Sequence, residues 1–452
     1  MSFSALDSGL LGPLFASAAM REAFSDAARL AGMLRAEAAL ARAEAEVGLA
    51  PAALADAIAA IAPETLDIEA LAAGTALAGV PVIPFVAAVR KRLPPELEPA
   101  FHKGATTQDI ADTALVLQMR SGFDLIAAES EAVVAGLVCL ATEHRATPCV
   151  GRTYGQHAAP ICFGYKAATW ALGLAEVTDQ LPGLRARVLT ASLGGPVGTL
   201  GALGGQAEAV ATAYARHLGL GPETVAWHTR RARIAEAGGW LARLLGALAK
   251  CAGDIAHLAS TEVAEVSEPF VPGRGGSSAM PHKRNPVSAT VILAAFGAAK
   301  GHAGTLLDTM AAAHERPAGA WHAEWHALPQ LFGLASGALR EARAVAEGLV
   351  VDPGRMRRNL DLTRGLLFAD AAAAACARRC GGAAAHALVE RACAEVHASG
   401  RDLQTVLAAM PEAQGIDLGA AFDLTHPVAA AAAATDRALA QIAARANSTA
   451  SQ

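Results

Sequence analysis

The chain has 452 residues, of which 53% are hydrophobic, 17% charged and 4% aromatic, and its formal net charge is −5 at pH 7. An apolar excess made mainly of Ala, Leu and Val is typical of closely packed helices, and it indicates a large core or much surface buried between subunits. The lack of a basic tail or stripe argues against nucleic acid as a partner.

Cysteine usage and the N-terminal residues indicate the compartment. Seven scattered cysteines without a Cys-x-x-Cys pair are typical of a reducing cytoplasm, not of a disulfide framework. The first 20 residues lack a basic start and contain Asp7 and Pro13, so we do not expect a signal peptide. We expect no membrane span either, because charges, glycines or prolines interrupt every apolar stretch of sufficient length.

Helical periodicity dominates the first third of the chain. Residues 21–47 carry an apolar stripe with helical spacing, and residues 63–99 predict short helices and proline-rich turns. The segment 101–113 leads into a long helix that extends to about residue 145. Asp109 and Asp112 lie in its first turns, where the helix dipole favours acids.

The middle of the chain alternates loops with helices. We expect a loop at 148–160 and a helix at 161–190. The turn at 192–205 is rich in glycine, but no strand precedes it and no Gly-Lys-Ser/Thr closes it, so it does not predict a nucleotide site. Between residues 234 and 266 apolar residues recur at 3,4 spacing, which predicts a long helix packed on others.

The second half of the chain also predicts helices, with long ones at 287–313 and 322–349. No alternating strand pattern is evident, so the sequence predicts an all-α fold, in which a central bundle of long helices is flanked by two smaller helical domains. The expected boundaries are 1–110 for the N-terminal helical domain, 111–351 for the bundle and 352–452 for the C-terminal helical domain.

The segment 273–286, GRGGSSAMPHKRNP, concentrates chemistry. Its glycines let the backbone move and approach a ligand, and its prolines keep it from becoming helix. The segment also brings together Ser277, Ser278, Lys283 and Arg284. No folding requirement explains this density, so we interpret the segment as a functional loop and not as a solvated basic stretch.

This loop resembles the signature G-S-S-x-M-P-x-K-x-N of the fumarase/aspartase superfamily, with a full match over residues 276–285. Two further family segments occur in the expected order. The motif H-x-G-x-T-S-x-D corresponds to residues 102–109, with Thr107 in place of Ser. The motif G-R-T-H-G-Q corresponds to residues 151–156, with Tyr154 in place of His.

The resemblance covers roughly residues 20–370 and sets expectations for assembly and site. It implies an all-α homotetramer, active sites each built from three subunits, and no metal or organic cofactor. The family's functional residues carry over, position by position, as catalytic residues Ser277 and Lys283 and as substrate-binding residues His102, Thr106, Thr107, Gln156, Asn285 and Arg316.

Two branches of the superfamily remain open. Residues 280–286 and 314–316 are similar to adenylosuccinate lyases, which release fumarate by β-elimination. Residues 15–49, 105–120 and 321–325 look more like 3-carboxy-cis,cis-muconate cycloisomerases, which belong to the protocatechuate branch of aromatic degradation. Those enzymes close a tricarboxylate diene into 4-carboxymuconolactone.

Tyr154 offers a chemical discriminator between these branches. In the lyases a histidine occupies this position, matched to protonating a leaving amine or alkoxide, which leaves poorly as an anion. In lactonisation the group that adds or leaves is a carboxylate, with a pKa of about 4, and it needs no proton from the enzyme. A site without the histidine therefore favours the cycloisomerase, although a tyrosine can still act as a weak acid.

The expected mechanism begins when one substrate carboxylate attacks a double bond of the same molecule. Negative charge then spreads onto another carboxylate as an enediolate, which loop N–H groups and Lys283 stabilise in the manner of an oxyanion hole. Ser277 donates a proton to the carbon, and the positive charge of Lys283, Arg284 and Arg316 makes the alkoxide accessible. Closure of the loop excludes water. Thr106, Thr107 and His102, near a helix N-terminus, form a natural anion site.

Two other patterns need interpretation. His322 and His326 share a helix face, but no third ligand has clear spacing and no His-Glu-x-x-His motif occurs, so we expect no metal. The family segment similar to Q-R-D-R reads Arg230-Arg231-Ala232-Arg233 here. The added cation either suits a more highly charged substrate or is a surface change, and the sequence does not decide between these.

Overall fold

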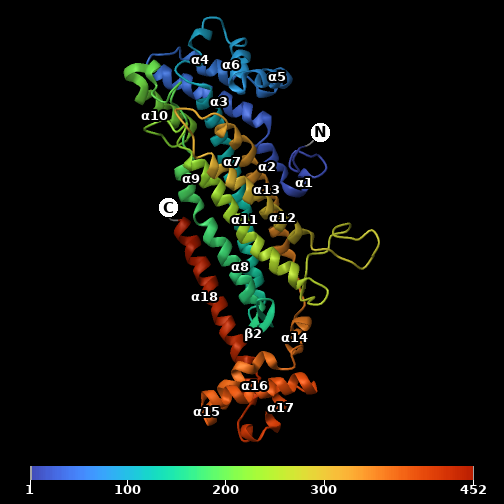
Figure 1. The fold of residues 1–452 in the computed structure, drawn as a ribbon. Coiled ribbons are helices and arrows are strands. Elements are labelled where there is room, and N and C mark those ends of the chain that lie inside the picture. The colour runs from blue at the N-terminus through green and yellow to red at the C-terminus, as the bar shows by residue number, and fades with distance from the viewer. Residues whose placement is uncertain (1–2, 451–452) are drawn as a thin grey trace. The chain divides into compact units, whose positions relative to one another are not determined.

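The computed structural model describes residues 3–450, with side chains up to residue 446. It is mostly helical, with two short antiparallel strand pairs, so the predicted all-α class is confirmed (Figure 1). The chain forms two compact units. Unit 1 contains Met1–Ser130, Val177–Ala249 and Val291–Arg340, and unit 2 contains Glu131–Glu176, Lys250–Thr290 and Glu341–Gln452.

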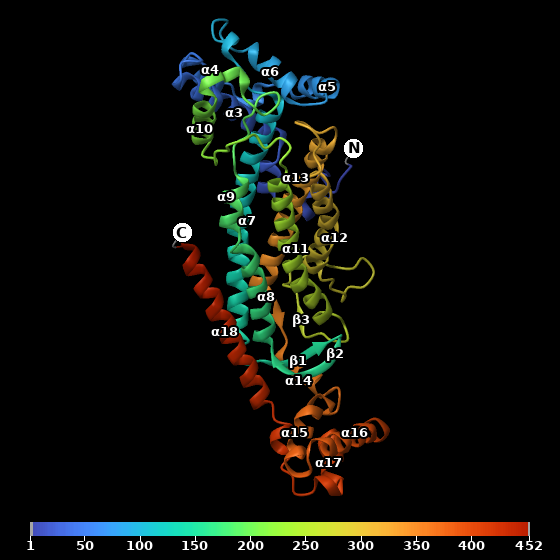
Figure 2. The same ribbon diagram turned by 60° about the vertical axis from the view of Figure 1, so that its left-hand side comes forward.

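The N-terminal part of unit 1 consists of short helices around one longer helix. Their bounds are Gly12–Phe15 (α1), Ala18–Ala23 (α2), Asp26–Glu46 (α3), Ala53–Ala59 (α4), Ile68–Ala78 (α5) and Val82–Arg90 (α6). The helix predicted over 21–47 is divided at Phe24, because the Ser25 hydroxyl caps α3 by accepting a hydrogen bond from the Ala28 N–H. α3 packs against α4 and against α10 (Ala207–Leu218) (Figures 1 and 2).

Four long helices contribute residues to both units, namely α7 (Thr107–Glu143), α11 (Ala232–Leu258), α12 (Val287–Asp308) and α13 (Ala320–Gly348). In unit 1 they pack through aromatic rings, with the Phe123 ring centroid 5.0 Å from that of Phe332 and 5.9 Å from that of Trp240. A methyl group added at Gly238 would lie 2.3 Å from the Leu306 side chain, so the glycine on α11 makes room for a leucine of α12. The long helices predicted from apolar spacing are confirmed.

The expected loop at 148–160 is instead a β-hairpin, which corrects the sequence analysis. β1 (Pro148–Thr153) pairs antiparallel with β2 (Gln156–Cys162) in unit 2. Tyr154 and Gly155 form the turn with φ of +51° and +79°, the left-handed pair that the twist of a two-residue hairpin requires. The helix expected at 161–190 is also divided, into α8 (Phe163–Thr178) and α9 (Leu181–Val188).

The C-terminal part of unit 2 is helical as predicted. Its helices are α14 (Pro353–Asp361), α15 (Ala369–Cys380), α16 (Gly382–Ser399), α17 (Leu403–Ala409) and α18 (Thr425–Ala450). α15, α16 and α17 gather around a small apolar core that includes Cys376, Leu388 and Leu403 (Figure 2). β3 (Val266–Ser267) pairs with β4 (Val350–Val351).

Two further expectations concern domains and membranes. The three predicted domains divide the chain differently from the two compact units, so their boundaries remain a prediction. By length and composition alone α7 and α12 could cross a bilayer, but core helices of soluble proteins meet the same criterion. The charged side chains Asp109, Asp112 and Arg120 on α7 make contacts inside unit 1, as expected of a core helix.

Candidate active site

The N-terminus of α7 brings together three of the predicted substrate-binding residues within unit 1. Arg316 precedes α13 and donates from Nη2 to the Thr106 hydroxyl and from Nε to Gln108 Oε1, both at 3.1 Å. Thr107 is the first residue of α7, and Thr106, Thr107 and Arg316 are all half-buried. An anion at this point would meet a guanidinium, two hydroxyls and the first N–H groups of a helix.

Asp109 holds the first turn of α7 in place through a network of hydrogen bonds. Its fully buried carboxylate accepts hydrogen bonds from the N–H groups of Gly194, Gly195 and Thr106 at 2.8–2.9 Å and from His228 Nε2 at 2.6 Å. The glycine-rich turn therefore donates its backbone N–H groups to a carboxylate of the protein itself. A methyl group at Gly194 would lie 2.4 Å from the Ala226 Cβ, so only glycine lets this turn approach.

His102 lies in the loop just before α7 and is paired with an acid. Its Nδ1 is 2.6 Å from Oε1 of Glu37, a residue of α3 whose side chain is only 1% exposed. The His102 backbone has φ of +59°, an unfavourable region for a residue with a Cβ, so the loop holds this histidine in a constrained position.

The signature loop lies between β3 and α12 in unit 2, where it extends as an open loop (Figure 1). The loop is closed at its neck, because the backbone N–H and the Nδ2 of Asn285 both donate to the Gly275 carbonyl, at 2.9 and 3.1 Å. Inside the loop the Ser277 hydroxyl accepts from the N–H groups of Ala279 (3.3 Å) and Met280 (3.1 Å). Lys283 is exposed, and the loop thus presents a hydroxyl and an ammonium on a defined neck.

The base of this loop is anchored more firmly than its tip. Arg274 pairs with Glu341 and donates to the Ser288 hydroxyl at 2.9 Å. Glu268 accepts from the N–H groups of Ser288 (3.0 Å) and Ala289 (2.9 Å), and so caps the first turn of α12.

Tyr154 occupies the turn of the β1–β2 hairpin, and its side chain is fully exposed within the single chain. Gln156, the next predicted site residue, starts β2 and is also exposed. Arg152 on β1 is engaged within the protein, because it forms a bidentate pair with the fully buried Glu265 at 2.6 and 3.0 Å. The hairpin is therefore anchored through Arg152, while the side chains of Tyr154 and Gln156 remain accessible to a ligand.

The three arginines of the Arg230–Arg233 segment all form ion pairs with acids of unit 1. Arg231 is 2% exposed and lies between two buried carboxylates, donating to Asp112 Oδ2 at 2.7 Å and to Glu324 Oε1 at 2.9 Å. Arg230 and Arg233 both pair with Glu223, at 2.9 and 2.7 Å. Arg231 and Arg233 stand where the family segment also has arginine, whereas Arg230, the added cation, is 53% exposed and pairs with Glu223 at the surface of unit 1.

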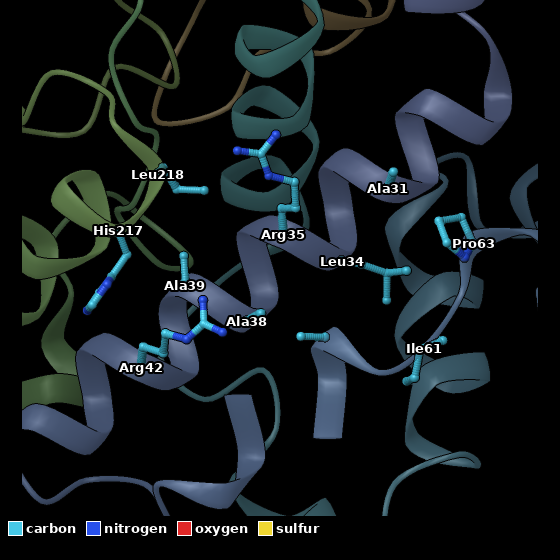
Figure 3. A pocket seen from close by; sticks show the side chains of 11 residues that line it. Ala31, Leu34, Arg35, Ala38, Ala39, Arg42, Ile61, Pro63, His217 and Leu218 are labelled. Carbon is cyan, nitrogen blue, oxygen red and sulfur yellow. The ribbon is translucent and has the colours of Figure 1, made fainter. Parts of the chain in front are cut away.

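A separate hollow of about 230 Å³ lies on α3 in unit 1 (Figure 3). Arg35, Ala38 and Arg42 line it from α3, and His217 lines it from α10. None of the predicted site residues lines it, so it is distinct from the α7 site. Among the described residues no group of three or more His, Cys, Asp or Glu side chains is placed to hold a metal ion.

Comparison with known proteins decides the family. A family model described as "Lyase" matches residues 15–301, more than half of the chain. The chain belongs to this fumarase/aspartase family of lyases. The recognition of the superfamily from the three motifs is thereby confirmed.

Individual members of the family show how similar the chain is to characterised enzymes. It is 46% identical to a 3-carboxy-cis,cis-muconate cycloisomerase of Pseudomonas putida, over 89% of this chain and 96% of that protein. It is 43% identical to a nitrosuccinate lyase of Streptomyces davaonensis, over 96% and 95%. A crystal structure of the 3-carboxy-cis,cis-muconate lactonizing enzyme of Pseudomonas putida superposes with a TM-score of 0.92 at 44% identity, covering 97% of this chain and all of that chain.

Sequence reasoning gave no site role to Asp109, Glu37 or Glu44, of which Asp109 and Glu37 contact the predicted site residues Thr106 and His102. Asp109 is the last residue of the family motif at 102–109, so its place there was the available signal. Glu37 and Glu44 follow Leu30 at intervals of seven residues, and all three are buried on α3. An acid on an apolar stripe signals a buried pair, and that pattern would have pointed to Glu37.

Proposed function

We propose that the chain catalyses the cycloisomerisation of 3-carboxy-cis,cis-muconate to 4-carboxymuconolactone, a step of protocatechuate catabolism. The observation that carries this proposal is the intact signature loop with Ser277 and Lys283, combined with Tyr154 where the lyases have a histidine. The similarity to cycloisomerases from several bacteria supports it. The reaction is an intramolecular carboxylate addition, with proton transfer through an enediolate-like intermediate.

The polar groups of the site match a small tricarboxylate. Arg316, Thr106, Thr107 and His102 supply cationic and hydroxyl donors at the α7 N-terminus. In unit 2, Gln156 and Asn285 supply amides. Ser277 is proposed as the proton donor to carbon and Lys283 as the cation that stabilises the enediolate.

We propose further that the enzyme is a cytoplasmic homotetramer with active sites shared between subunits. The apolar surface of α12 supports the assembly, because an 18-residue apolar window of this helix is only 28% buried within the chain. Leu293 and Leu307 on α12 are 39% and 61% exposed. An apolar helix face of this extent is typical of a surface that another copy covers.

A second candidate is the elimination of nitrite from nitrosuccinate, which the 43% identity to a nitrosuccinate lyase favours. Nitrite, like a carboxylate, is a stable anion that leaves without being protonated. Tyr154 therefore does not separate this reaction from lactonisation. It argues only against the release of amines and alkoxides, and hence against the adenylosuccinate lyase alternative.

The test is an ultraviolet assay of the purified enzyme on 3-carboxy-cis,cis-muconate, nitrosuccinate and adenylosuccinate. We expect turnover of carboxymuconate, and turnover of either other substrate without it would overturn the assignment. Ser277→Ala should lower kcat roughly 10²–10⁴-fold, the usual contribution of a general acid. Its melting temperature should not change, because the hydroxyl bonds only to N–H groups of its own loop.

Ser278→Ala is the matched control for that variant, since Ser278 is an exposed neighbour in the same loop. It should lose much less activity than Ser277→Ala. Near-normal turnover by Ser277→Ala would show that another group moves the proton.

A further inference from the structure

The pair formed by His102 and Glu37 has the geometry of a strong hydrogen bond. The 2.6 Å between His102 Nδ1 and Glu37 Oε1 is shorter than a neutral N–H···O bond and is typical of a bond between ionised partners. The Glu37 side chain is 1% exposed and that of His102 is 15% exposed. Both groups are thus withdrawn from water, where their mutual attraction is least screened.

The two ring nitrogens of His102 have different surroundings. Nδ1 faces Glu37, and among the described residues no hydrogen bond of the chain engages Nε2. Nε2 is not among the buried side-chain atoms that lack a partner, so it remains open to a ligand. An imidazolium held in this way donates inward to Glu37 and outward to an anion.

Other charges around His102 act in both directions. Asp109 at the start of α7 and Glu37 favour its protonated form, whereas Arg90 on α6 opposes it. Lys103 follows it in the chain, with Nζ at 3.5 Å from the Leu49 carbonyl. Burial works against the charge, but the charge of Glu37 and its hydrogen bond outweigh burial and raise the pKa of His102 above its usual value.

Glu44 lies two turns along α3 from Glu37 and provides a contrast. It is also buried, but burial raises its pKa to about 8, assisted by the charge of Glu37 and opposed by Lys103 and His102. Near neutral pH Glu44 therefore carries a proton, and of these two acids of α3 it is Glu37 that is hydrogen-bonded to His102.

We propose that Glu37 is a positioning residue, which holds His102 as an imidazolium with its Nε2–H directed toward one carboxylate of the substrate. The role deepens the proposed function, on which it rests, because it requires an anionic substrate at the α7 N-terminus. Glu37 itself does not touch the substrate; it acts through His102.

The proposal predicts a specific pH dependence of anion binding. Binding that needs His102 in its charged form is complete below the pKa of this group and is lost as pH rises through it. Without the charge and hydrogen bond of Glu37, burial and Arg90 are opposed by Asp109 alone, and the pKa of His102 falls. The loss of binding then begins at a lower pH than in the wild type.

The experiment measures binding of tricarballylate, an unreactive tricarboxylate, by calorimetry from pH 5 to pH 7 with wild type and Glu37→Gln. We expect the ratio of the variant and wild-type Kd values to rise steadily with pH between pH 5 and pH 7, because the variant loses the charge of His102 at a lower pH than the wild type. Taking the ratio at each pH cancels the titration of the ligand. Glu44→Gln is the matched control, and its ratio should stay near one because Glu44 is already neutral.

A ratio for Glu37→Gln that is constant with pH would overturn the proposal, because a merely structural defect weakens binding equally at every pH. If Glu37→Gln does not fold, the comparison of His102→Gln with the wild type decides. The ratio of their Kd values must fall as pH rises, because the wild type loses the charge of His102, and a ratio that is constant with pH contradicts the proposal. Turnover of carboxymuconate is a separate readout, so failure of the proposed function leaves this binding test intact.

Discussion

At the scale of single residues, Arg231 shows how the segment at 230–233 is held inside unit 1. Its guanidinium lies 4.7 Å from the centre of the Trp227 ring, and it bonds to Asp112 and Glu324. Burial raises the pKa of Glu324 against the hydrogen bonds from Arg231, so the carboxylate depends on this cation for its charged form. Asp112 also accepts from the Trp321 indole at 2.9 Å, and the cluster thereby ties α7 to α13 inside unit 1.

Replacing Arg231 with Met should destabilise the protein by about 3–5 kcal/mol, because it leaves two buried carboxylates without their cation. The neighbouring Arg230→Met is the control, because the Arg230 side chain is 53% exposed and should contribute at most about 1 kcal/mol. The check is the melting temperature of both variants at one protein concentration. Equal shifts would show that the buried cluster does not hold unit 1 together.

The pKa shift of Glu324 adds a pH dependence to this variant, with a definite sign. A carboxyl group whose pKa is raised on folding favours the folded state at low pH and loses that contribution as pH rises through the folded pKa. Removing Arg231 raises the pKa of Glu324 further, because the cation lowers it in the wild type. The deficit of Arg231→Met relative to wild type should therefore shrink as pH falls.

At the scale of elements, the neck of the signature loop depends on one glycine. Gly275 has φ of +69°, and a Cβ at this position would lie 2.6 Å from the Asn285 carbonyl oxygen. That contact lies beside the two hydrogen bonds that Asn285 makes to the Gly275 carbonyl. The conformation of the neck therefore depends on a glycine at position 275. Asn285 has a structural role there as well as its proposed contact with substrate.

Gly275→Ala should lower kcat roughly tenfold to a hundredfold while leaving the melting temperature nearly unchanged, because a small displacement of Ser277 and Lys283 suffices to disturb catalysis. In Gly276→Ala the added methyl group meets no heavy atom within 4 Å, so this variant should retain most of the activity. Steady-state kinetics on carboxymuconate compares the two. Equal losses of kcat in the two variants would show that the close contact of Gly275 with Asn285 is not what catalysis depends on.

The same scale shows what sequence could predict. Apolar residues at 3,4 spacing located α7, α11, α12 and α13, because long packed helices impose that period on many consecutive residues. The β1–β2 hairpin was missed because residues 148–162 contain few β-branched residues, and its turn is Tyr-Gly and not the more usual Asn-Gly. A short strand pair leaves too few positions for its period to be recognised.

The candidate site was predictable only where a motif carries it. The three family motifs gave the eight predicted site residues except Arg316, which came from its own similarity to the family. The partners of these residues are distant in sequence, as Glu37 is from His102 and Gly194 is from Asp109. The apolar stripe of α3 marks Glu37 as a buried acid, but its partner is decided by tertiary packing, which no local pattern encodes.

At the scale of the whole molecule, the predicted site residues fall into two groups on one chain. Arg316 contacts Thr106 in unit 1, whereas Ser277 and Lys283 share one loop in unit 2. The family resemblance implies that such groups from different subunits complete each active site. Arg316 and Thr106 are in contact within one chain and therefore belong to the same subunit of any active site. The signature loop that completes the site can come from a different subunit.

Mixing two inactive variants tests this arrangement. Ser277→Ala and Arg316→Met should each be inactive as homotetramers, and subunit exchange between them should restore part of the wild-type turnover, because some mixed sites receive both intact groups. The matched control mixes Ser277→Ala with Lys283→Met, whose positions lie in one loop, so every site keeps at least one defect. The readout is turnover of carboxymuconate after partial denaturation and reassembly, with native mass spectrometry to verify mixed tetramers. No recovery in the first mixture despite mixed tetramers would mean that each subunit builds its site alone, and recovery in the control would mean that Ser277 and Lys283 do not serve the same site.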